Sequence, residues 1–471
     1  MNADPGNFPA AAREALHDPK LKLALGRLKT HFQIRRSESV ERYGDFETLR
    51  EAGRAIRDYS LGHLNTLLET FERNATARGG HVHWARDKTE ACATVLKILR
   101  ETGAVTVTKG KSMVSEEIGL NAYLEANGVT PVETDLGEYI IQLRKERPSH
   151  ILAPAFHLNK EDVSDTFREA HTELDPARPL GDRPALVAEA RRMLRAKFEA
   201  ADAGITGANF LAAEEGACVL VTNEGNGDLT RLLPRTHIVV TGIEKVVRDL
   251  NDAAVLLRLL TRSATGQEIS SYVSVMSGPR RAGETDGPQN FHVVLVDNGR
   301  SRLLGTAAED VLRCIRCGAC LNHCPVYSAV GGHAFGTTYP GPIGAALNPG
   351  LLGLAAAHHH PNASTFCGRC EQVCPVKIPL PRIMRYWRAR EYAGGLAPRA
   401  AVFGLSLWAY VAKRPRLYQL LARIAARVLK RKACNGVVHS MPLMQGWFLV
   451  RDFPAPSGKT FQKMWNDERA R

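Results

Sequence analysis

The stretch Cys314-Ile-Arg-Cys317-Gly-Ala-Cys320-Leu-Asn-His-Cys324-Pro325 decides the fold of the C-terminal part of this chain. Its C-x2-C-x2-C-x3-C-P spacing is typical of two-cluster iron–sulfur modules, in which the cysteine before the proline ligates the neighbouring cluster. A second run follows after 42 intervening residues and reads Cys367-Gly-Arg-Cys370-Glu-Gln-Val-Cys374-Pro375. This crossed arrangement predicts one cluster on Cys314, Cys317, Cys320 and Cys374, and a second cluster on Cys324, Cys367 and Cys370.

Zinc and disulfides are the competing interpretations of these cysteines. A structural zinc site uses four ligands, usually as two C-x2-C pairs, and leaves no role for the extra cysteine or for the prolines Pro325 and Pro375. Disulfides suit secreted scaffolds, whereas no secretory signal opens this chain. The spacing therefore favours two iron–sulfur clusters and single-electron transfer.

The fourth ligand of the second cluster is not visible in the sequence. A full second motif would carry a cysteine at position 364, where this chain has Ser364. The site could hold a [3Fe-4S] cluster, or a [4Fe-4S] cluster completed by Ser364, a histidine or an exogenous ligand. His358, His359 and His360 are nearby, although a surface loop is the simpler explanation for them. His323 is expected beside the cluster or in solvent.

Composition predicts a soluble, cytoplasmic protein with two or three domains. The chain has 471 residues, of which 44% are apolar and 24% charged. Cluster assembly needs reduced thiols, and the remaining cysteines, Cys92, Cys218 and Cys434, are expected to be small buried residues. The longest apolar stretch, Ala400 to Ala412, is shorter than the roughly 18 residues that span a bilayer. Charged residues between Asp4 and Lys20 interrupt any signal-peptide core.

The positive charge of the chain is concentrated in its tail. From Pro381 to Arg471, eighteen Lys or Arg residues stand against four acidic ones, whereas the net charge of the whole chain is +13. Base-stacking aromatics are few and no nucleic-acid motif is present, so a protein partner or a membrane surface is favoured. The tail also predicts a helix with an apolar stripe of Leu417, Leu420, Leu421, Ile424 and Val428 opposed by Arg423, Arg427, Lys430 and Arg431. Packing of this stripe on the protein's own body is favoured slightly over docking on a partner or membrane.

Upstream of the cysteines, helical patterns alternate with short β-branched runs, which predicts a mostly parallel sheet covered by helices. The predicted strands are Ala104–Thr108, His150–Ala153, Ala217–Thr222, His237–Thr241 and Phe291–Val296. The predicted helices are Lys88–Thr102, Ser115–Asn127, Pro184–Ala200 and Gly242–Ala264, with Ala307–Leu312 and Arg382–Tyr392 in the cysteine region. The resulting organisation is an N-terminal helical extension over 1–63, an α/β domain over 64–304, a ferredoxin-type domain over 305–395 and a basic helical tail over 396–471.

Two loops of the α/β region resemble nucleotide-binding motifs but fail their spacing. Gly103 precedes Gly110 by seven positions where a phosphate-binding loop requires five, and Thr230 stands where a dinucleotide fingerprint requires a glycine. Mobile turns are the simpler explanation. Such loops also follow the carboxyl ends of strands, where α/β folds bind ligands. They could therefore line a pocket with Lys109, Lys111, Ser112, Asn223, Glu224 and Asn226.

Several runs in order resemble the family of lactate utilization protein B, the iron–sulfur subunit of bacterial lactate utilisation systems. These runs are Lys109-Gly-Lys-Ser-Met-Val-Ser-Glu-Glu-Ile-Gly-Leu-Asn121, Glu133-Thr-Asp-Leu-Gly-Glu-Tyr139, Val221-Thr-Asn-Glu-Gly-Asn-Gly227, Gly242-Ile-Glu-Lys245 and Cys374-Pro-Val-Lys-Ile-Pro379. The resemblance implies a lactate-utilisation domain, similar in fold to sugar isomerases and CoA transferases, followed by a module for two four-iron clusters. It also implies that three cysteines in the second motif are normal for the family.

The resemblance implies membership of a three-protein system that oxidises L-lactate to pyruvate. The leading hypothesis is a cytoplasmic, non-catalytic electron-transfer subunit that works with other subunits of that system. The alternative is a self-contained iron–sulfur oxidoreductase whose α/β domain binds and oxidises a small hydroxy acid. An iron–sulfur regulator that binds DNA through the basic tail is a weaker third. Catalytic residues cannot be identified from the sequence.

Overall fold

The computed structural model describes residues 8–442, 448 and 451–469. Contacts within the chain divide it into two compact units, Met1–Glu391 and Tyr392–Arg471. The first unit holds both the α/β region and all seven motif cysteines.

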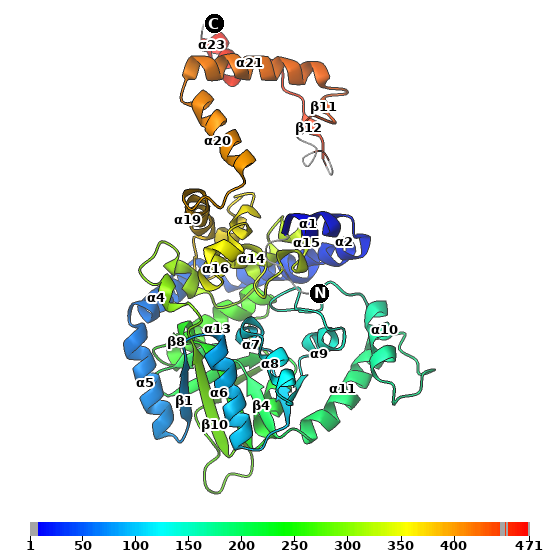
Figure 1. Cartoon of the computed structure of the whole chain (residues 1–471), viewed down its shortest axis with the longest axis vertical. Coiled ribbons are helices and arrows are strands. Elements are labelled where there is room, and N and C mark those ends of the chain that lie inside the picture. Colours follow the sequence, from blue (N-terminus) through cyan, green and yellow to red (C-terminus); the bar gives the residue numbers. More distant parts are fainter. Residues whose placement is uncertain (1–7, 443–447, 449–450, 470–471) are drawn as a thin grey trace. The chain divides into compact units, whose positions relative to one another are not determined.

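A six-stranded parallel sheet forms the centre of the first unit (Figure 1). The strand order is β1-β10-β7-β4-β2-β3, and every neighbouring pair is parallel. The strands are β1 (His81–Ala85), β2 (Thr106–Lys109), β3 (Thr130–Glu133), β4 (Ala203–Thr206), β7 (Thr236–Gly242) and β10 (Asn290–Val296). The predicted α/β class with a mostly parallel sheet is therefore confirmed.

Helices and a smaller sheet cover the two faces of this parallel sheet. Helix α5 (Leu64–Ala77) packs on one face with Val293, whereas α6 (Lys88–Glu101) packs on the other with Val294. Because both faces are covered, β7 and β10 are apolar along much of their length rather than alternating. The other helices of this region are α7 (Met113–Ile118), α8 (Leu120–Ala126), α9 (Leu136–Leu143), α10 (Lys160–Ala170), α11 (Arg183–Glu199), α12 (Asn226–Leu232) and α13 (Leu250–Ala264).

A four-stranded mixed sheet with the order β8-β5-β6-β9 shares the hydrophobic cluster of α5. Its strands are β5 (Phe210–Ala212), β6 (Ala217–Thr222), β8 (Val246–Val247) and β9 (Tyr272–Met276). Strand β6 runs antiparallel to both of its neighbours. The end of β6 therefore brings the loop after Thr222 towards the carboxyl ends of β2 and β4, where a cavity opens.

The N-terminal helices pack against the cysteine region, which lies more than 250 residues away in the sequence. These helices are α1 (Phe8–Leu16), α2 (Pro19–Gly26), the π-helix Lys29–Ile34, α3 (Arg35–Tyr43) and α4 (Phe46–Gly62). Leu28 and Phe32 share one hydrophobic core with Leu321 and Tyr327. The N-terminal helices therefore pack on the cysteine region.

Short helices and turns build the cysteine region. Its elements are the 3₁₀-helix η5 (Glu309–Arg313), α14 (Ala319–Asn322), α15 (Tyr327–Val330), α16 (Gly341–Leu351), α17 (Leu354–Ala357), α18 (Arg369–Gln372) and α19 (Leu380–Ala393). Helix α16 is buried along most of its length, so the Gly/Pro-rich stretch before the second cysteine run is part of the core.

Several local predictions were wrong. Residues 150–153 form a turn instead of a strand, because the N–H groups of Leu152 and Ala153 donate to Nδ1 of His150 and not to a neighbouring strand. The helix predicted over Ser115–Asn127 is divided at Gly119, whose φ is 71°.

The helix predicted to begin at Gly242 begins only at Leu250, since β7 runs on to Gly242 and a 3₁₀ turn and β8 follow it. The helix predicted over Ala307–Leu312 is the 3₁₀-helix η5.

The second unit contains the helices and strands α20 (Arg399–Ala412), α21 (Pro415–Lys432), β11 (Val437–Val438), β12 (Phe453–Pro454) and α23 (Phe461–Arg469). None of these helices buries a described residue. The stripe side chains Leu420 and Ile424 are 54% and 46% exposed. Cys434 is exposed, contrary to the prediction of a buried cysteine, whereas Cys92 and Cys218 are buried as predicted. No helix among the described residues is long and apolar enough to cross a membrane.

Candidate iron–sulfur centre and the neighbouring cavity

The seven motif cysteines converge in the first unit and fall into two groups, judged by which thiols influence one another electrostatically. The first cysteine set is Cys314, Cys317, Cys320 and Cys374. The second cysteine set is Cys324, Cys367 and Cys370. Cys320 is also influenced by Cys370, so the two sets adjoin. This grouping agrees with the crossed spacing, and the assignment of the two sets to two clusters stays a prediction.

The backbone around the cysteines turns so that amide groups face sulfur. Arg316 and Phe366, each directly before a cysteine, have φ values of 60° and 53°, and Gly318 and Gly368, each directly after it, have φ values of 71° and 78°. Amide N–H groups donate to sulfur from Arg316 to Cys314 (3.4 Å), from Tyr327 to Cys324 (3.5 Å) and from Ile378 to Cys374 (3.3 Å). Hydrogen bonds to sulfur of this kind tune the potential of iron–sulfur clusters.

The sulfur atoms of the described cysteines are not gathered closely enough for a single zinc ion. Four thiolates at about 2.3 Å from one zinc ion would lie about 3.8 Å apart. In the described part of the chain, the only group of three or more possible metal ligands with all ligand atoms within 4.8 Å of one another contains no cysteine. All ten cysteines are free, so no disulfide competes for the thiols.

The buried thiols need a bound cation to become thiolates. Burial raises the pKa of Cys374 to about 11 and the pKa of Cys370 to about 12. Thiols with these pKa values stay protonated at pH 7, whereas coordination to a metal removes their protons. The donor set therefore fits iron–sulfur clusters.

Ser364 lies beside the second cysteine set. A small cavity of about 20 Å³ is lined by Cys324, Cys367, Cys370 and Ser364. The Ser364 hydroxyl accepts a hydrogen bond from the Phe366 amide (3.1 Å).

Unlike Ser364, the nearby histidines lie outside the small cavity beside the second cysteine set. Nδ1 of His358 is 2.8 Å from a carboxylate oxygen of Glu391, and Nδ1 of His360 is 3.1 Å from the Asn348 amide nitrogen. Nδ1 of His323 is 2.8 Å from the Ala319 carbonyl oxygen. None of these histidines lines the small cavity.

Two arginines from the N-terminal helices reach the first cysteine set. Arg50 donates to the Cys374 carbonyl oxygen (2.8 and 3.0 Å), and Arg36 donates to the Val373 carbonyl oxygen (3.0 Å). Burial lowers the pKa of Arg36, and the nearby charge of Cys317 opposes that shift. The sequence predicted no chemistry for the N-terminal helices. No motif could have revealed these arginines, because 324 positions separate Arg50 from Cys374.

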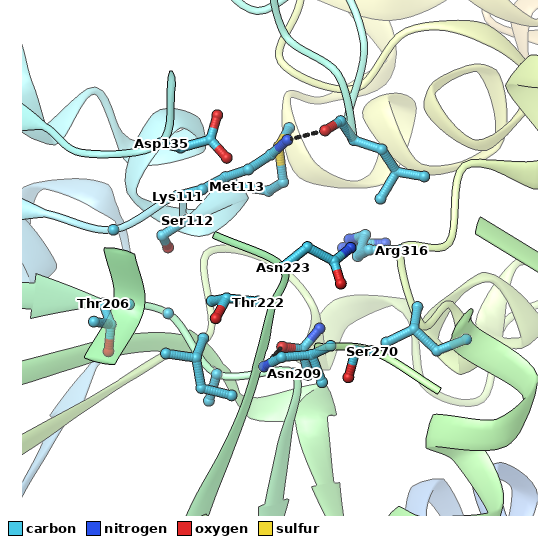
Figure 2. A pocket seen from close by; sticks show the side chains of 18 of the residues that line it. Lys111, Ser112, Met113, Asp135, Thr206, Asn209, Thr222, Asn223, Ser270 and Arg316 are labelled. Carbon is cyan, nitrogen blue, oxygen red and sulfur yellow. Dashed lines mark hydrogen bonds between the residues drawn. The ribbon is translucent and has the colours of Figure 1, made fainter. Parts of the chain in front are cut away.

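A second feature, the sheet-edge cavity, encloses about 290 Å³ at the carboxyl ends of β2 and β4 (Figure 2). Of the residues predicted to line a pocket, Lys111, Ser112, Asn223, Glu224 and Asn226 do so. Lys111 donates to the Leu152 carbonyl oxygen (2.6 Å).

Lys109 does not line the sheet-edge cavity, contrary to the prediction. It is fully buried, and its Nζ lies 2.9 Å from Glu116 and 2.6 Å from Glu133. These carboxylates outweigh the effect of burial and raise the pKa of Lys109. Burial raises the pKa of Glu133 to about 7.

Two cations that the sequence did not predict, Lys245 and Arg316, also line the sheet-edge cavity. Arg316 stands between two cysteines of the first set, so the cavity touches the loop that carries them. Its guanidinium lies 3.3 Å from Glu244 and 4.6 Å from the ring centroid of Tyr339. Lys245 ends the 3₁₀ turn after β7. Only the folded chain brings these residues to one cavity.

Three family models match the chain. They are described as the LUD domain, over residues 68–296, a 4Fe-4S dicluster domain, over residues 310–378, and the C-terminal region of lactate utilisation protein B, over residues 384–470. The second match shows an iron–sulfur domain, and the first agrees with the parallel α/β sheet.

Curated relatives match over nearly their whole length. A protein named Lactate utilization protein B from Geobacillus sp. (strain WCH70) is 40% identical over 100% of this chain and 98% of its own. Its namesake from Bacillus pumilus (strain SAFR-032) is 42% identical, with coverages of 97% and 96%. A solved DUF162 family protein from Deinococcus radiodurans covers 50% of this chain and 98% of its own at 15% identity, but the TM-score of 0.29 is too low to establish a common fold.

Proposed function

Because the chain belongs to the lactate utilization protein B family, we propose that it is the iron–sulfur electron-transfer subunit of a system that oxidises L-lactate to pyruvate and allows growth on lactate. The observation that carries this proposal is the convergence of seven cysteines into two adjoining sets inside a chain that matches the family over its full length. Two adjoining sets of this kind offer a path for single electrons through the chain.

In this proposal the two cysteine sets hold two [4Fe-4S] clusters. The first set supplies four thiolates, and the second set supplies three. Ser364 is the candidate for the fourth position of the second cluster, because it lines the same small cavity as the three cysteines. Each cluster, when bound, takes up and gives back one electron.

Residues around the two cysteine sets stabilise the negative charge that a bound cluster would carry. Burial of Cys317, Cys324, Cys370 and Cys374 keeps water away from the sulfur atoms. The amide groups of Arg316, Tyr327 and Ile378 donate to sulfur and stabilise negative charge there. Arg36 and Arg50 place positive charge next to the first set, which favours the form that carries the extra electron.

Other subunits of the lactate-oxidising system are the proposed partners, and the cytoplasm is the proposed location. Electrons enter from a redox centre of a partner and leave towards the respiratory chain. The basic second unit is the proposed contact to a partner or to an anionic membrane surface. Its exposed side chains Phe403 and Trp408, 72% and 65% exposed, support this role.

Iron and sulfide analysis tests the cluster part of this proposal. Protein purified without oxygen should contain about eight iron and eight acid-labile sulfide per chain, as two four-iron clusters require, and should show cluster signals in electron paramagnetic resonance after reduction. In the Ser364→Cys variant, the second cluster should have four thiolate ligands. On exposure to air, this cluster should lose its fourth iron atom more slowly than the second cluster of the parent protein does. Colourless protein that contains zinc and no sulfide would contradict the proposal.

A growth experiment tests the physiological part. Deletion of the gene in a host without other lactate dehydrogenases should abolish growth on L-lactate, and the intact gene should restore it. Unimpaired growth of the deletion strain on L-lactate would exclude the proposed role.

A further inference from the structure

Electron transfer between the two cysteine sets gives no role to the sheet-edge cavity. The cavity lies at the edge of a parallel sheet where ligands commonly bind, and its volume of about 290 Å³ suits a small molecule. Its lining combines apolar side chains with hydroxyl and amide groups, among them Ser112, Asn209, Thr222, Asn223 and Ser270 (Figure 2). Such a mixture suits a small polar molecule with a short carbon skeleton.

Lys245 is the decisive residue of this cavity. The residue is only 5% exposed, and its Nζ has no hydrogen bond or ion pair within 4 Å among the described residues, although the charge of Glu244 acts on it from farther away. The adjacent carboxylate of Glu244 is engaged elsewhere, by Arg300 (2.6 Å) and by Arg316 (3.3 Å). Lys245 lines the cavity, and burial lowers its pKa to about 7. An anion in the cavity would favour its charged form.

Lys111 and Arg316 also bring positive charge to this cavity. Lys111 donates to the Leu152 carbonyl oxygen, and Arg316 pairs with Glu244 (3.3 Å). Nε of the Arg316 guanidinium is buried and makes no hydrogen bond with any described residue.

The two acidic residues of the lining are occupied at α9, where Asp135 accepts from the Glu138 amide and Glu224 accepts from the Leu136 amide. Lys245 and Arg316 place positive charge on the part of the lining next to the cysteine loop, whereas the acidic residues are bound at the start of α9.

From this geometry we infer that the sheet-edge cavity binds a small 2-hydroxy or 2-oxo carboxylic acid, with its carboxylate held by Lys245 and Arg316. The carboxylate follows from the two cations, and the hydroxyl or oxo group suits the surrounding hydroxyl and amide groups. The choice of 2-substituted acids rests also on the proposed function in lactate oxidation. This binding site goes beyond electron transfer, because it places the organic acid on the subunit that carries the clusters.

The bound acid would touch the loop of the first cysteine set. Arg316 follows Cys314 by two positions and directly precedes Cys317, and consecutive Cα atoms are about 3.8 Å apart. A carboxylate on this guanidinium therefore adds negative charge next to the first set. Occupancy of the cavity should alter the spectroscopic signature of the first cluster as well as the heat of binding.

Isothermal titration calorimetry on full-length, cluster-loaded protein tests this inference without any activity assay. The probes are L-lactate, pyruvate, propane-1,2-diol as the uncharged analogue and inorganic phosphate as the alternative anion. The matched variants are Lys245→Met, which removes the buried ammonium, and Lys97→Met, which removes an ammonium that is 75% exposed. Lys245→Gln serves in place of Lys245→Met if that variant does not fold with full iron content.

Saturable binding of L-lactate or pyruvate, with little binding of propane-1,2-diol or phosphate, supports the inference. Lys245→Met should weaken binding of the acid roughly 10- to 100-fold, as expected for loss of a hydrogen bond to a charged group. The same variant should have an unchanged or higher thermal midpoint, because an unpaired buried charge is lost. Lys97→Met should bind like the parent.

Absence of binding by both acids overturns the inference, and so does equal binding by the parent and Lys245→Met. Equal binding of propane-1,2-diol or phosphate also overturns it, because the carboxylate would then not be recognised. The lactate growth experiment separates the two proposals. A protein that is required for growth but binds neither acid keeps the proposed function and loses this site, whereas a dispensable protein that binds the acid loses the proposed function and keeps the site.

Discussion

At residue scale, the cysteine sites depend on backbone conformations that ordinary side chains rarely adopt. Arg316 has a φ of 60°, in the left-handed region, and Gly318 two positions later has a φ of 71°. Cys317 lies between them, so the chain reverses around this one thiol. The cost of placing an arginine in this conformation is met by its ion pair with Glu244 and its contact with Tyr339. The same residue then serves both the first cysteine set and the cavity.

Replacement of Cys317 tests the assignment of the first set. Cys317→Ser should remove about four of the eight iron atoms, because a four-iron cluster with one thiolate replaced is held less firmly. Iron analysis and electron paramagnetic resonance of anaerobic protein measure the loss. Cys434→Ser is the matched control, since Cys434 is exposed and lies in the second unit. Equal iron content in the two variants would show that Cys317 is not a ligand.

His150 makes the stability of the first unit depend on pH. Burial lowers the pKa of His150 to about 4. Its Nδ1 accepts from two amides, and its Nε2–H donates to Asn322 (2.9 Å). The unfolded chain takes up the proton near pH 6.5. The stability due to the neutral ring is therefore complete above that pH and is lost as the pH falls towards 4.

A change from pH 7.5 to pH 5.5 should therefore cost about 1.4 kcal/mol through His150 alone. The thermal midpoint of the anaerobic protein should fall over this range, and it should fall less in His150→Gln. His17→Gln, at an exposed histidine, should behave like the parent. A parent midpoint that rises towards pH 5.5, or a His150→Gln variant with the same fall as the parent, would contradict this assignment.

At the scale of elements, a buried ion pair network joins the parallel sheet to the cysteine region. Arg300 is fully buried and binds Glu117 of α7 (2.7 Å) and Glu244 of the 3₁₀ turn after β7 (2.6 Å). The surrounding cations hold the pKa of Glu244 at about 2 despite its burial. Glu244 also binds Arg316, so the network connects the sheet to the first cysteine set.

Arg300→Met should destabilise the first unit by about 3–5 kcal/mol, because it leaves the buried Glu117 without its cation and removes one of the two cations paired with Glu244. Thermal unfolding of the anaerobic protein measures the effect, and the iron content shows whether the clusters remain. Arg302→Met is the control, since Arg302 is exposed in the short 3₁₀-helix Ser301–Leu303, which directly follows Arg300. A midpoint for Arg300→Met equal to that of the control would mean that the network adds no stability.

The sequence predicted those elements whose pattern is local. Strand β6 matches its predicted residues, and β7 is one apolar run, so both could be recognised from neighbouring side chains. Residues 150–153 are equally apolar, but their amides bind His150, and this contact is invisible in a hydrophobic pattern. The break between α7 and α8 was missed because the hydrophobic pattern continues across Gly119. The sequence alone does not show that this glycine adopts a left-handed conformation.

The candidate sites divide in the same way. The seven cysteines could be recognised from their spacing, because each run is short; their crossed assignment to two clusters stays a prediction. Lys111 and Asn223 were predicted in the cavity because each follows the end of a strand. Arg36, Lys245 and Arg316 escaped prediction, since their roles depend on which distant segments meet. Lys109 was wrongly predicted to line the cavity, because its ion pair with Glu133, 24 positions later in the chain, could not be recognised from the sequence.

At the scale of the whole molecule, the N-terminal helices form part of the surroundings of the first cysteine set. Arg36 of α3 lies close enough to Cys317 and Cys374 for their charges to act on it. Loss of this positive charge should disfavour the reduced form of the first cluster. Arg36→Met should therefore lower the reduction potential of the first cluster, on the order of tens of millivolts.

Potentiometric titration followed by electron paramagnetic resonance measures this potential. Arg42→Met is the matched control on the same helix, because Arg42 is exposed and pairs with the exposed Glu268. An unchanged potential in Arg36→Met, or an equal change in Arg42→Met, would contradict a charge effect of Arg36 on the first cluster.

The packing of α2 and α3 against the cysteine region has a consequence for biosynthesis. The ribosome releases the N-terminal helices first, yet their partners around Leu321 and Cys374 emerge some 300 residues later. Contacts between residues so far apart in the sequence form late. The α/β sheet can therefore fold before the N-terminal helices have their packing partners. Iron can then be inserted after the cysteines have been synthesised and before the N-terminal helices pack over them. A chain that closed before it received its iron would bury its thiols beyond the reach of the assembly machinery.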